Sequence, residues 1–270
     1  MRKFKGSLLS AFTWFWILLA FFPVGWMFFT SLKSEQDAAT IPPTFAVSLN
    51  FDQYRAVWDR GLSQYMFNSA FASIASTILV LAIAVPAAYG LSIRPIRKVR
   101  DVLFFFISTR FLPVAAAILP LYFILKNIGM LDNVTSLTLL YGAMNLPIAV
   151  WMMRSFFKDV PTEIVEAGQV DGANLRVEIT RIVLPIVAPG VAAVALISFI
   201  FAWNEYFLAL ILTSSSARTL PPYLASFVDG RGQFLAVLSA ASTLAVLPVV
   251  MAGWAAQKQL VRGLAMGAVK

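Results

Sequence analysis

Long apolar runs separated by polar segments dominate the pattern along the chain. A membrane-spanning helix needs about 20 mostly apolar residues, and six stretches meet that requirement. They are Leu8–Leu32, Phe67–Ile93, Val102–Leu125, Thr135–Met153, Pro185–Leu212 and Phe234–Ala256. The pattern therefore predicts an all-α integral membrane protein with six transmembrane helices.

The first run has one feature of a cleavable signal peptide, because Arg2, Lys3 and Lys5 precede it. It is, however, too long and too rich in aromatic residues for a signal peptide, and it lacks a small-residue cleavage site. We therefore interpret Leu8–Leu32 as a retained span.

The positions of the cations predict the orientation of the spans. Six spans put both termini on one side of the membrane, and 14 of the 21 Lys and Arg residues then fall on that side. Arg110 lies within the third span, and the remaining cations fall on the opposite side. Because cytoplasmic loops carry an excess of Lys and Arg, both termini are expected to be cytoplasmic.

Composition narrows the function classes. The chain is 60% hydrophobic and 13% charged, whereas soluble domains carry about 25% charged residues, so a soluble enzyme and a nucleic-acid binder are poor fits. With no Cys and no His, a disulfide framework, a thiolate nucleophile and a His-ligated or Cys-ligated zinc site are excluded. An integral membrane enzyme would need a convergent acid-base or metal cluster, but the acidic residues are scattered.

The polar segment between the fourth and fifth spans, residues 154–184, carries helix signals. Pro161 with Glu166 soon after it favours a helix start, because carboxylates suit the positive end of the helix dipole. Asp171-Gly172 favours a helix stop, and Asn174 is expected to cap a second short helix set at an angle to the first. The apolar stripe of that second helix is Leu175, Ile179 and Ile182.

A face of small residues on this segment suits close approach by another backbone, so we expect a partner protein to bind here. The alternative is an amphipathic helix on the membrane surface, which the acidic residues disfavour because anionic lipid would repel them. The small residues are Ala167, Gly168, Gly172 and Ala173.

The spacing of Glu166-Ala167-Gly168, Gly172, Ile182 and Leu184-Pro185 resembles the signature loop of binding-protein-dependent ABC importer permeases. Gly168 replaces the alanine usual in that family, which lowers helix propensity by up to about 1 kcal/mol. Further short motifs resemble the maltose-type carbohydrate permeases. They are Pro86–Leu91, Arg110–Pro113, Leu119–Tyr122, Asn145–Pro147, Phe201–Tyr206, Val261–Leu264 and Gly267–Lys270.

This resemblance implies a type I ABC importer permease in the bacterial inner (plasma) membrane, as a multi-pass and non-catalytic subunit. The implied partners are a second homologous permease, a cytoplasmic ATPase dimer that holds ATP and Mg, and an extracytoplasmic solute-binding protein that delivers a sugar-like solute. By resemblance, the ATPase contact is formed by Glu166, Ala167, Gly168, Asp171, Gly172 and Ala173, and motion passes through Leu184 and Pro185.

The expected domains are an N-terminal span with an extracytoplasmic loop, 1–66, and a core permease domain, 67–270, with the coupling loop 154–184. Within the external part, the segment Lys33–Tyr65 is expected to be either part of the dock for the solute-binding protein or a plain folded cap. The C-terminal tail is expected either to reach the ATPase dimer or to be a frayed terminus.

Ionisable groups inside a membrane are costly and are by default functional or paired. Arg110 is expected to pair with a backbone carbonyl or a partner-subunit carboxylate, with solute contact as the alternative. From their estimated depths, Arg110 and Glu205 need not touch. Aromatic and amide groups beside Glu205 suit a sugar, although aromatic residues also belong to the membrane interface. The expected solute path comprises Arg110, Asn145, Trp203, Asn204, Glu205 and Tyr206.

The main rival function is a secondary transporter or channel that needs no ATPase. Such proteins commonly contain inverted repeats, and none is evident here. The solute itself stays open among oligosaccharide, modified sugar, polyol and glycerol phosphate, because a separate binding protein largely sets recognition.

Overall fold

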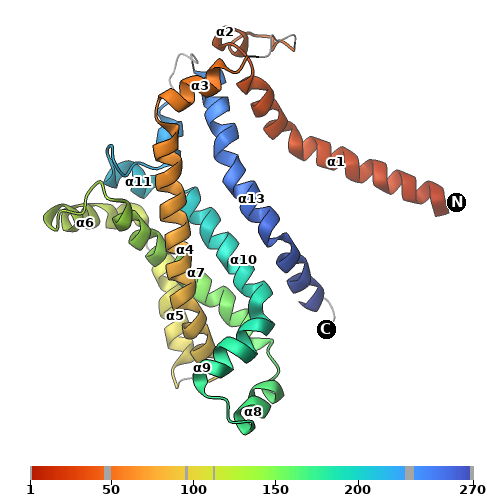
Figure 1. Cartoon of the computed structure of the whole chain (residues 1–270), viewed down its shortest axis with the longest axis vertical. Coiled ribbons are helices and arrows are strands. Elements are labelled where there is room, and N and C mark those ends of the chain that lie inside the picture. The colour runs from red at the N-terminus through yellow and green to blue at the C-terminus, as the bar shows by residue number, and fades with distance from the viewer. Residues whose placement is uncertain (1, 46–49, 95–96, 112, 229–233, 268–270) are drawn as a thin grey trace. The chain divides into compact units, whose positions relative to one another are not determined.

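The computed structural model describes residues 2–45, 50–94, 97–111, 113–228 and 234–267, and its regular elements within these ranges are helical (Figure 1). In chain order they are α1 (Arg2–Ser31), α2 (Glu35–Ala38), α3 (Asp52–Asp59), α4 (Leu62–Ser92), α5 (Val99–Arg110), α6 (Val114–Asn127), α7 (Val134–Lys158), α8 (Thr162–Val170), α9 (Leu175–Val177), the π-helical η1 (Glu178–Val183), α10 (Leu184–Trp203), α11 (Phe207–Leu212), α12 (Leu220–Ala225) and α13 (Leu235–Gly267). The all-α prediction is confirmed.

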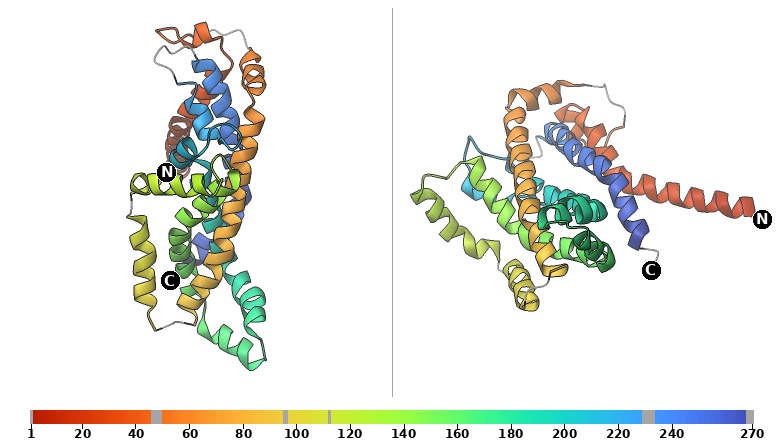
Figure 2. Two further views of the ribbon diagram at one scale, coloured as in Figure 1. Left: turned by 90° about the vertical axis from the view of Figure 1, so that its left-hand side faces the viewer. Right: turned by 60° about the horizontal axis from the view of Figure 1, so that its bottom comes forward.

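The predicted third span, Val102–Leu125, is wrong as a single helix. In the described residues five helices are long and apolar enough to cross a membrane, and a sixth span exists if α5 and α6 count as one. These two helices meet at 86°, and Figure 2 shows the turn. Pro113 is extended, with φ −62° and ψ 123°, and it has no N–H with which to continue α5. A proline within the apolar run therefore divides the span.

The predicted fifth span, Pro185–Leu212, is also broken. Its helix starts earlier, at Leu175, and ends at Trp203. The carboxylate of Glu205 then accepts hydrogen bonds from the N–H groups of Leu208 (2.9 Å) and Ala209 (3.2 Å). Glu205 thus satisfies the free donors at the start of a new helix, α11, which explains why hydrophobicity alone overestimates the length of this span.

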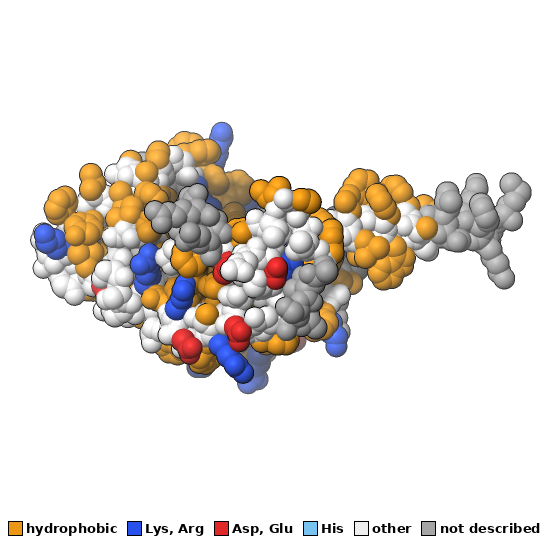
Figure 3. All heavy atoms as spheres, turned by 90° about the horizontal axis from the view of Figure 1, so that it is seen from above, with side chains coloured by type: hydrophobic (Ala, Val, Ile, Leu, Met, Phe, Trp, Pro, Cys, Tyr) orange, Lys and Arg blue, Asp and Glu red, His pale blue; other side chains and the backbone are white. Residues whose placement is uncertain are grey.

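The side chains of α1 from Leu9 to Val24 are exposed. The candidate span within α1 is Leu9–Ser31, and its most hydrophobic 18 residues include no buried residue. Large side chains such as Phe12 and Phe21 are more than half exposed. Figure 3 shows hydrophobic side chains covering the described part of this helix. An apolar helix exposed on all sides suits contact with lipid or with another membrane helix.

The chain divides into two compact units, of which the first comprises Met1–Gln64 and Tyr223–Leu247. The carboxylate of Glu35 accepts hydrogen bonds from the N–H groups of Ala236 (2.9 Å) and Val237 (2.8 Å), and so caps the start of α13. The hydroxyl of Tyr223 donates to the carbonyl of Val57 at 3.2 Å. These bonds join segments far apart in the sequence.

Lys33 is buried in the same unit and forms no ion pair with any residue that the structure describes. Its ammonium donates to the carbonyl of Thr44 at 2.7 Å and lies 4.8 Å from the ring centroids of both Trp26 and Phe29. The described part of the segment after α1 is therefore a folded cap, and its role as a dock stays a prediction, as does a domain boundary at residue 66.

The second unit comprises Tyr65–Pro222 and Pro248–Lys270, and its core lies where α4, α7 and α10 pack together. Small residues such as Ala84 and Ala149 are completely buried there. A Cβ atom on Gly190 of α10 would overlap the ring of Phe156 on α7, so only glycine permits this contact without movement. Residues 268–270 of the predicted C-terminal tail lie outside the described residues.

Hydrogen bonds to Asp132 connect the α6–α7 turn to the segment that follows α11. Its carboxylate accepts hydrogen bonds from the N–H groups of Ser214 (3.0 Å), Ser216 (3.0 Å) and Ala217 (3.1 Å). Burial raises the pKa of Asp132, but these backbone donors outweigh burial and hold that pKa well below its usual range. The ionised carboxylate therefore stabilises this turn at neutral pH.

We predict that Asp132→Asn lowers the thermal unfolding midpoint by about 5 °C at pH 7, because an amide oxygen accepts these bonds more weakly than a carboxylate. Circular dichroism of the purified chain in detergent measures the change, with the exposed Asp101→Asn as control. Because the folded pKa is depressed, the contribution is complete at neutral pH and declines only below about pH 4. Equal midpoints for wild type and Asp132→Asn at pH 7 would contradict this account.

Candidate coupling helix and polar pocket

The boundaries of α8 agree with the signals in the sequence. Pro161 is extended and precedes the first helical residue, Thr162. Gly172 has φ +83°, a left-handed conformation that favours glycine, and it follows the last turn. The side chain of Asn174 accepts a hydrogen bond from the N–H of Val177 at 3.0 Å, as a helix cap does. The predicted start, stop and cap are therefore confirmed.

The second helix predicted after Gly172 is present but is not short, because α9, η1 and α10 form one continuous helix, Leu175–Trp203, that runs into the fifth span. Within η1 the N–H of Leu184 donates to the carbonyl of Ile179, five residues back instead of four. Pro185 has no N–H to continue the regular α pattern, which favours such a widened turn. Leu184 and Pro185 thus lie inside a long helix directly after a π-helical segment.

The residues predicted to contact an ATPase separate into two groups. Glu166, Ala167, Asp171 and Gly172 are exposed, so a partner can reach them. Gly168 instead lies against the chain itself, since a Cβ atom there would overlap Cδ1 of Ile182 in η1. Because Cδ1 is the free end of the Ile182 side chain, an alanine at position 168 would require only that this side chain shift. Ala173 is half-buried beside it.

Three apolar side chains of this region are exposed. Val170, at the end of α8, is 87% exposed, Leu175 is 50% exposed and Ile164 is 44% exposed, whereas Val165 of α8 is buried in the core. The helix is therefore fixed to the chain on one face and presents an apolar residue, flanked by acidic ones, on the other. Such a surface suits contact with another protein.

Glu178 is a buried carboxylate that sequence reasoning missed. It is the first residue of η1 and has no exposed side-chain surface. Its oxygens accept hydrogen bonds from the hydroxyl of Tyr89, from Nη2 of Arg94 at 2.7 Å and from Nε2 of Gln169 at 3.2 Å. The available signal was a carboxylate only seven residues before Pro185, at the edge of an apolar run, where an unpaired charge is costly.

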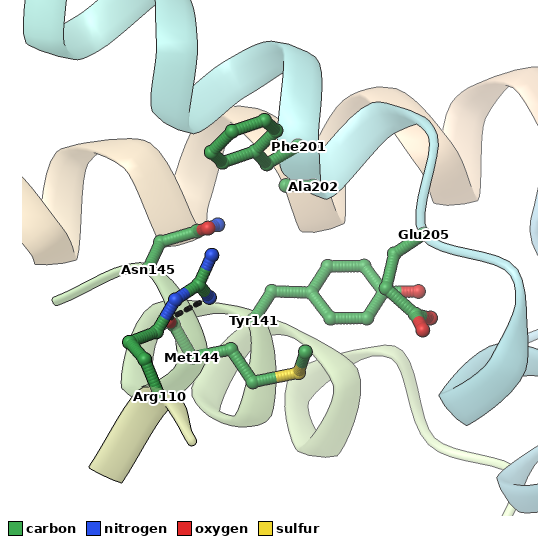
Figure 4. Close-up of a pocket in the computed structure, with 7 residues that line it drawn as sticks. All are labelled: Arg110, Tyr141, Met144, Asn145, Phe201, Ala202 and Glu205. Carbon is green, nitrogen blue, oxygen red and sulfur yellow. Dashed lines mark hydrogen bonds between the residues drawn. The ribbon is translucent and has the colours of Figure 1, made fainter. Parts of the chain in front are cut away.

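A pocket of about 210 Å³ brings together three of the residues predicted for the solute path (Figure 4). Arg110 comes from the end of α5, Asn145 from α7 and Glu205 from the break after α10. We call this the Arg110 pocket. Its lining is completed by four residues that the sequence did not indicate, Tyr141, Met144, Phe201 and Ala202.

The guanidinium of Arg110 donates to the carbonyl of Met144 at 2.9 Å, which is the backbone pairing expected for this residue. It also faces the pocket (Figure 4) and a neighbouring cavity of about 260 Å³ that is mostly apolar. The depth estimate indicated that Arg110 and Glu205 need not touch, and the structure places both in the lining of one pocket. The cause is the pair of helix breaks, after Arg110 and after Trp203, which hydrophobicity did not reveal.

The other residues predicted for the path lie elsewhere. Trp203 is buried and packs against Phe199, with ring centroids 5.6 Å apart. Asn204 is exposed and donates to the carbonyl of Ile200 in its own helix at 2.8 Å, and Tyr206 is 41% exposed. None of these three lines the Arg110 pocket.

The groups of the Arg110 pocket are those that bind polyhydroxylated molecules. A guanidinium, an amide and a carboxylate supply donors and acceptors, and Phe201 supplies an apolar ring face. The hydroxyl of Tyr141, almost fully buried, has no hydrogen-bond partner among the described residues. The described residues contain no group of three or more acidic residues able to hold a metal ion.

The chain is similar in sequence to known transport proteins. The sulfoquinovosyl glycerol transport system permease protein SmoH of Agrobacterium fabrum is 32% identical, over 92% of this chain and 88% of its own. The trehalose transport system permease protein SugB of Mycobacterium tuberculosis is 30% identical, over 93% of each chain.

Among solved structures, a chain of a bacterial ABC transporter that imports the acidic polysaccharide alginate has the same fold. Its TM-score is 0.76 at 23% identity, and the match covers 96% of this chain and 97% of that one. Residues 81–265 match the family described as the binding-protein-dependent transport system inner membrane component. The chain therefore belongs to that family, as a multi-pass permease of the bacterial inner membrane.

Proposed function

We propose that this chain is the membrane subunit through which an ABC importer passes a sugar or sugar-like solute, delivered by an extracytoplasmic binding protein. Its relatives SmoH and SugB are named as transport proteins for sulfoquinovosyl glycerol and trehalose, which supports a carbohydrate class. ATP and Mg would be bound by a separate ATPase dimer, and a second homologous permease would complete the path. This subunit itself would catalyse no reaction.

The single observation that carries the proposal is the placement of α8. One face, with Val165 and Gly168, is packed into the chain, while Glu166, Val170 and Asp171 are free for a partner. A helix held in this way transmits displacement because it does not deform independently of its base. ATP drives transport only if the ATPase binds one state of the permease better than the other, and α8 is the contact that would report that difference.

Solute would pass beside the Arg110 pocket. Its donors and acceptors come from α5, α7 and the α10–α11 break, so relative movement of these helices changes the pocket directly. The charge distribution supports an orientation with both termini and α8 in the cytoplasm, where an ATPase is found.

A pulldown with this chain as bait tests the importer against the rival secondary transporter. The chain, expressed from its native chromosomal context and extracted in dodecyl maltoside, is expected to recover an ATP-binding subunit. Proteoliposomes containing the recovered complex and the binding protein are expected to accumulate solute only with ATP inside. Uptake driven by an ion gradient with no ATPase present would favour the secondary transporter.

Gly172→Pro is predicted to reduce ATP-driven uptake at least tenfold while the chain still inserts. Proline cannot adopt φ +83°, and it also removes the N–H that donates to the carbonyl of Gln169 at 3.0 Å. The matched control is Gly172→Asn, because asparagine keeps the N–H and tolerates left-handed backbone. Uptake and ATPase activity of the purified complex measure the effect, and normal uptake by Gly172→Pro would refute the coupling role of α8.

Two substitutions of Glu205 separate solute contact from helix capping. Glu205→Gln keeps an oxygen that accepts from the N–H of Leu208 or Ala209, so assembly is predicted to stay normal while the apparent KM for solute rises about threefold to tenfold. Glu205→Ala removes the cap and is predicted also to lower the thermal midpoint. If Glu205→Gln leaves the KM unchanged, Glu205 serves only the cap.

A further inference from the structure

Three polar side chains meet around one buried carboxylate, that of Glu178 at the start of η1. They are Tyr89 near the end of α4, Arg94 just after it and Gln169 on α8, and together with Glu178 we call them the Glu178 cluster. None belongs to the set of residues that the family motif suggested for coupling.

The central carboxylate of the cluster requires hydrogen-bond donors because it is buried. Glu178 has no exposed side-chain surface, and a buried carboxylate is tolerated only when donors surround it. One oxygen accepts from Tyr89 and the other from both Arg94 and Gln169. Any movement that separates α8 or the end of α4 from η1 therefore leaves a buried charge with fewer donors.

The cluster lies where the end of α4, helix α8 and η1 meet. Helix α8 packs on η1 through several contacts, which include Gly168 against Ile182 and the hydrogen bond from Gln169 to Glu178. On its other side Glu178 is bonded to Tyr89, whose ring also packs against Phe157 of α7. One carboxylate thus joins α8, the base of the α10 helix and the end of α4.

The π-helical geometry fits a role in movement. A π-helical segment has a less regular hydrogen-bond pattern than an α-helix, and such segments are frequent at functional sites. Glu178 is the first residue of η1, and Pro185 is the second residue after the end of η1. The helix therefore has fewer regular backbone hydrogen bonds here than elsewhere. Side-chain bonds to α4 and α8 then determine where the base of α10 lies.

We propose that Glu178 is a positioning residue for coupling. It holds α8, η1 and the end of α4 together as one body, so that displacement of α8 by a partner moves the ends of two membrane helices at once. This inference rests on the proposed function, because it assigns the mechanical link between the ATPase contact and the membrane helices.

The test uses the complete transporter in proteoliposomes and measures solute uptake per ATP hydrolysed. Glu178→Gln keeps the size of the side chain and removes its charge, and it is expected to lower uptake per ATP about fivefold to tenfold at equal amounts of assembled complex. The matched control is Glu163→Gln on α8, an exposed glutamate with no hydrogen-bond partner among the described residues, which is expected to behave as wild type.

A second set of variants keeps the proposal falsifiable if Glu178→Gln assembles poorly. Arg94→Gln alters a half-exposed partner and Tyr89→Phe removes one hydroxyl, and both are expected to lower the same ratio. Combining Arg94→Gln with Glu178→Gln is expected to be no worse than the more severe single change, because both break one unit. Uptake that falls only in proportion to assembled complex would make the cluster merely structural and overturn the proposal.

Hydrogen exchange of the purified chain provides a readout that does not depend on transport. In Glu178→Gln, the backbone N–H groups of α8 are expected to exchange at least tenfold faster than in Glu163→Gln, because the hydrogen bond from Gln169 that holds α8 to η1 loses its charged acceptor. If wild type shows no ATP-dependent uptake, the proposed function fails while this result still tests the link. Unchanged exchange in α8 together with unchanged uptake per ATP would refute the role of Glu178.

Discussion

The close packing of α8 on η1 is the constraint on which the rest of the structure depends. Gly168 lies against the end of the Ile182 side chain, Val165 packs in the same core, and the hydrogen bond from Gln169 to Glu178 links the two helices. The face of α8 that remains outward carries the exposed Val170. The contact with η1 therefore buries one face of α8 and leaves the other face exposed. A nine-residue helix held in this way is able to transmit force.

Interrupted helices create the polar site. A membrane-embedded backbone must have its N–H and C=O groups satisfied, so a break is tolerated only where other groups supply the bonds. The carboxylate of Glu205 does so for α11, and Pro113 needs no donor at the start of α6. Both breaks direct charged side chains into the Arg110 pocket. Helix ends therefore place the groups that the proposed solute path requires.

Local signals were sufficient for much of the fold and for α8. Proline, glycine and asparagine at 161, 172 and 174 predicted its boundaries, because caps and left-handed turns depend on only a few neighbouring residues. The breaks at 111–113 and 204–206 were missed because hydrophobicity averages over a window. The Glu178 cluster and Tyr141 in the Arg110 pocket depend on contacts between residues far apart in sequence, which no local pattern encodes.

The most direct test of the coupling role uses the absence of cysteine from the natural sequence. With Val170→Cys as the single thiol of the permease, a bifunctional thiol reagent acting from the cytoplasmic side is predicted to crosslink position 170 to the ATPase subunit. A flexible crosslink should leave ATP hydrolysis intact, and a rigid short one should arrest ATP-driven uptake. Labelling of the cysteine only by an impermeant reagent outside the cell, or full uptake with the short crosslink in place, would contradict the account.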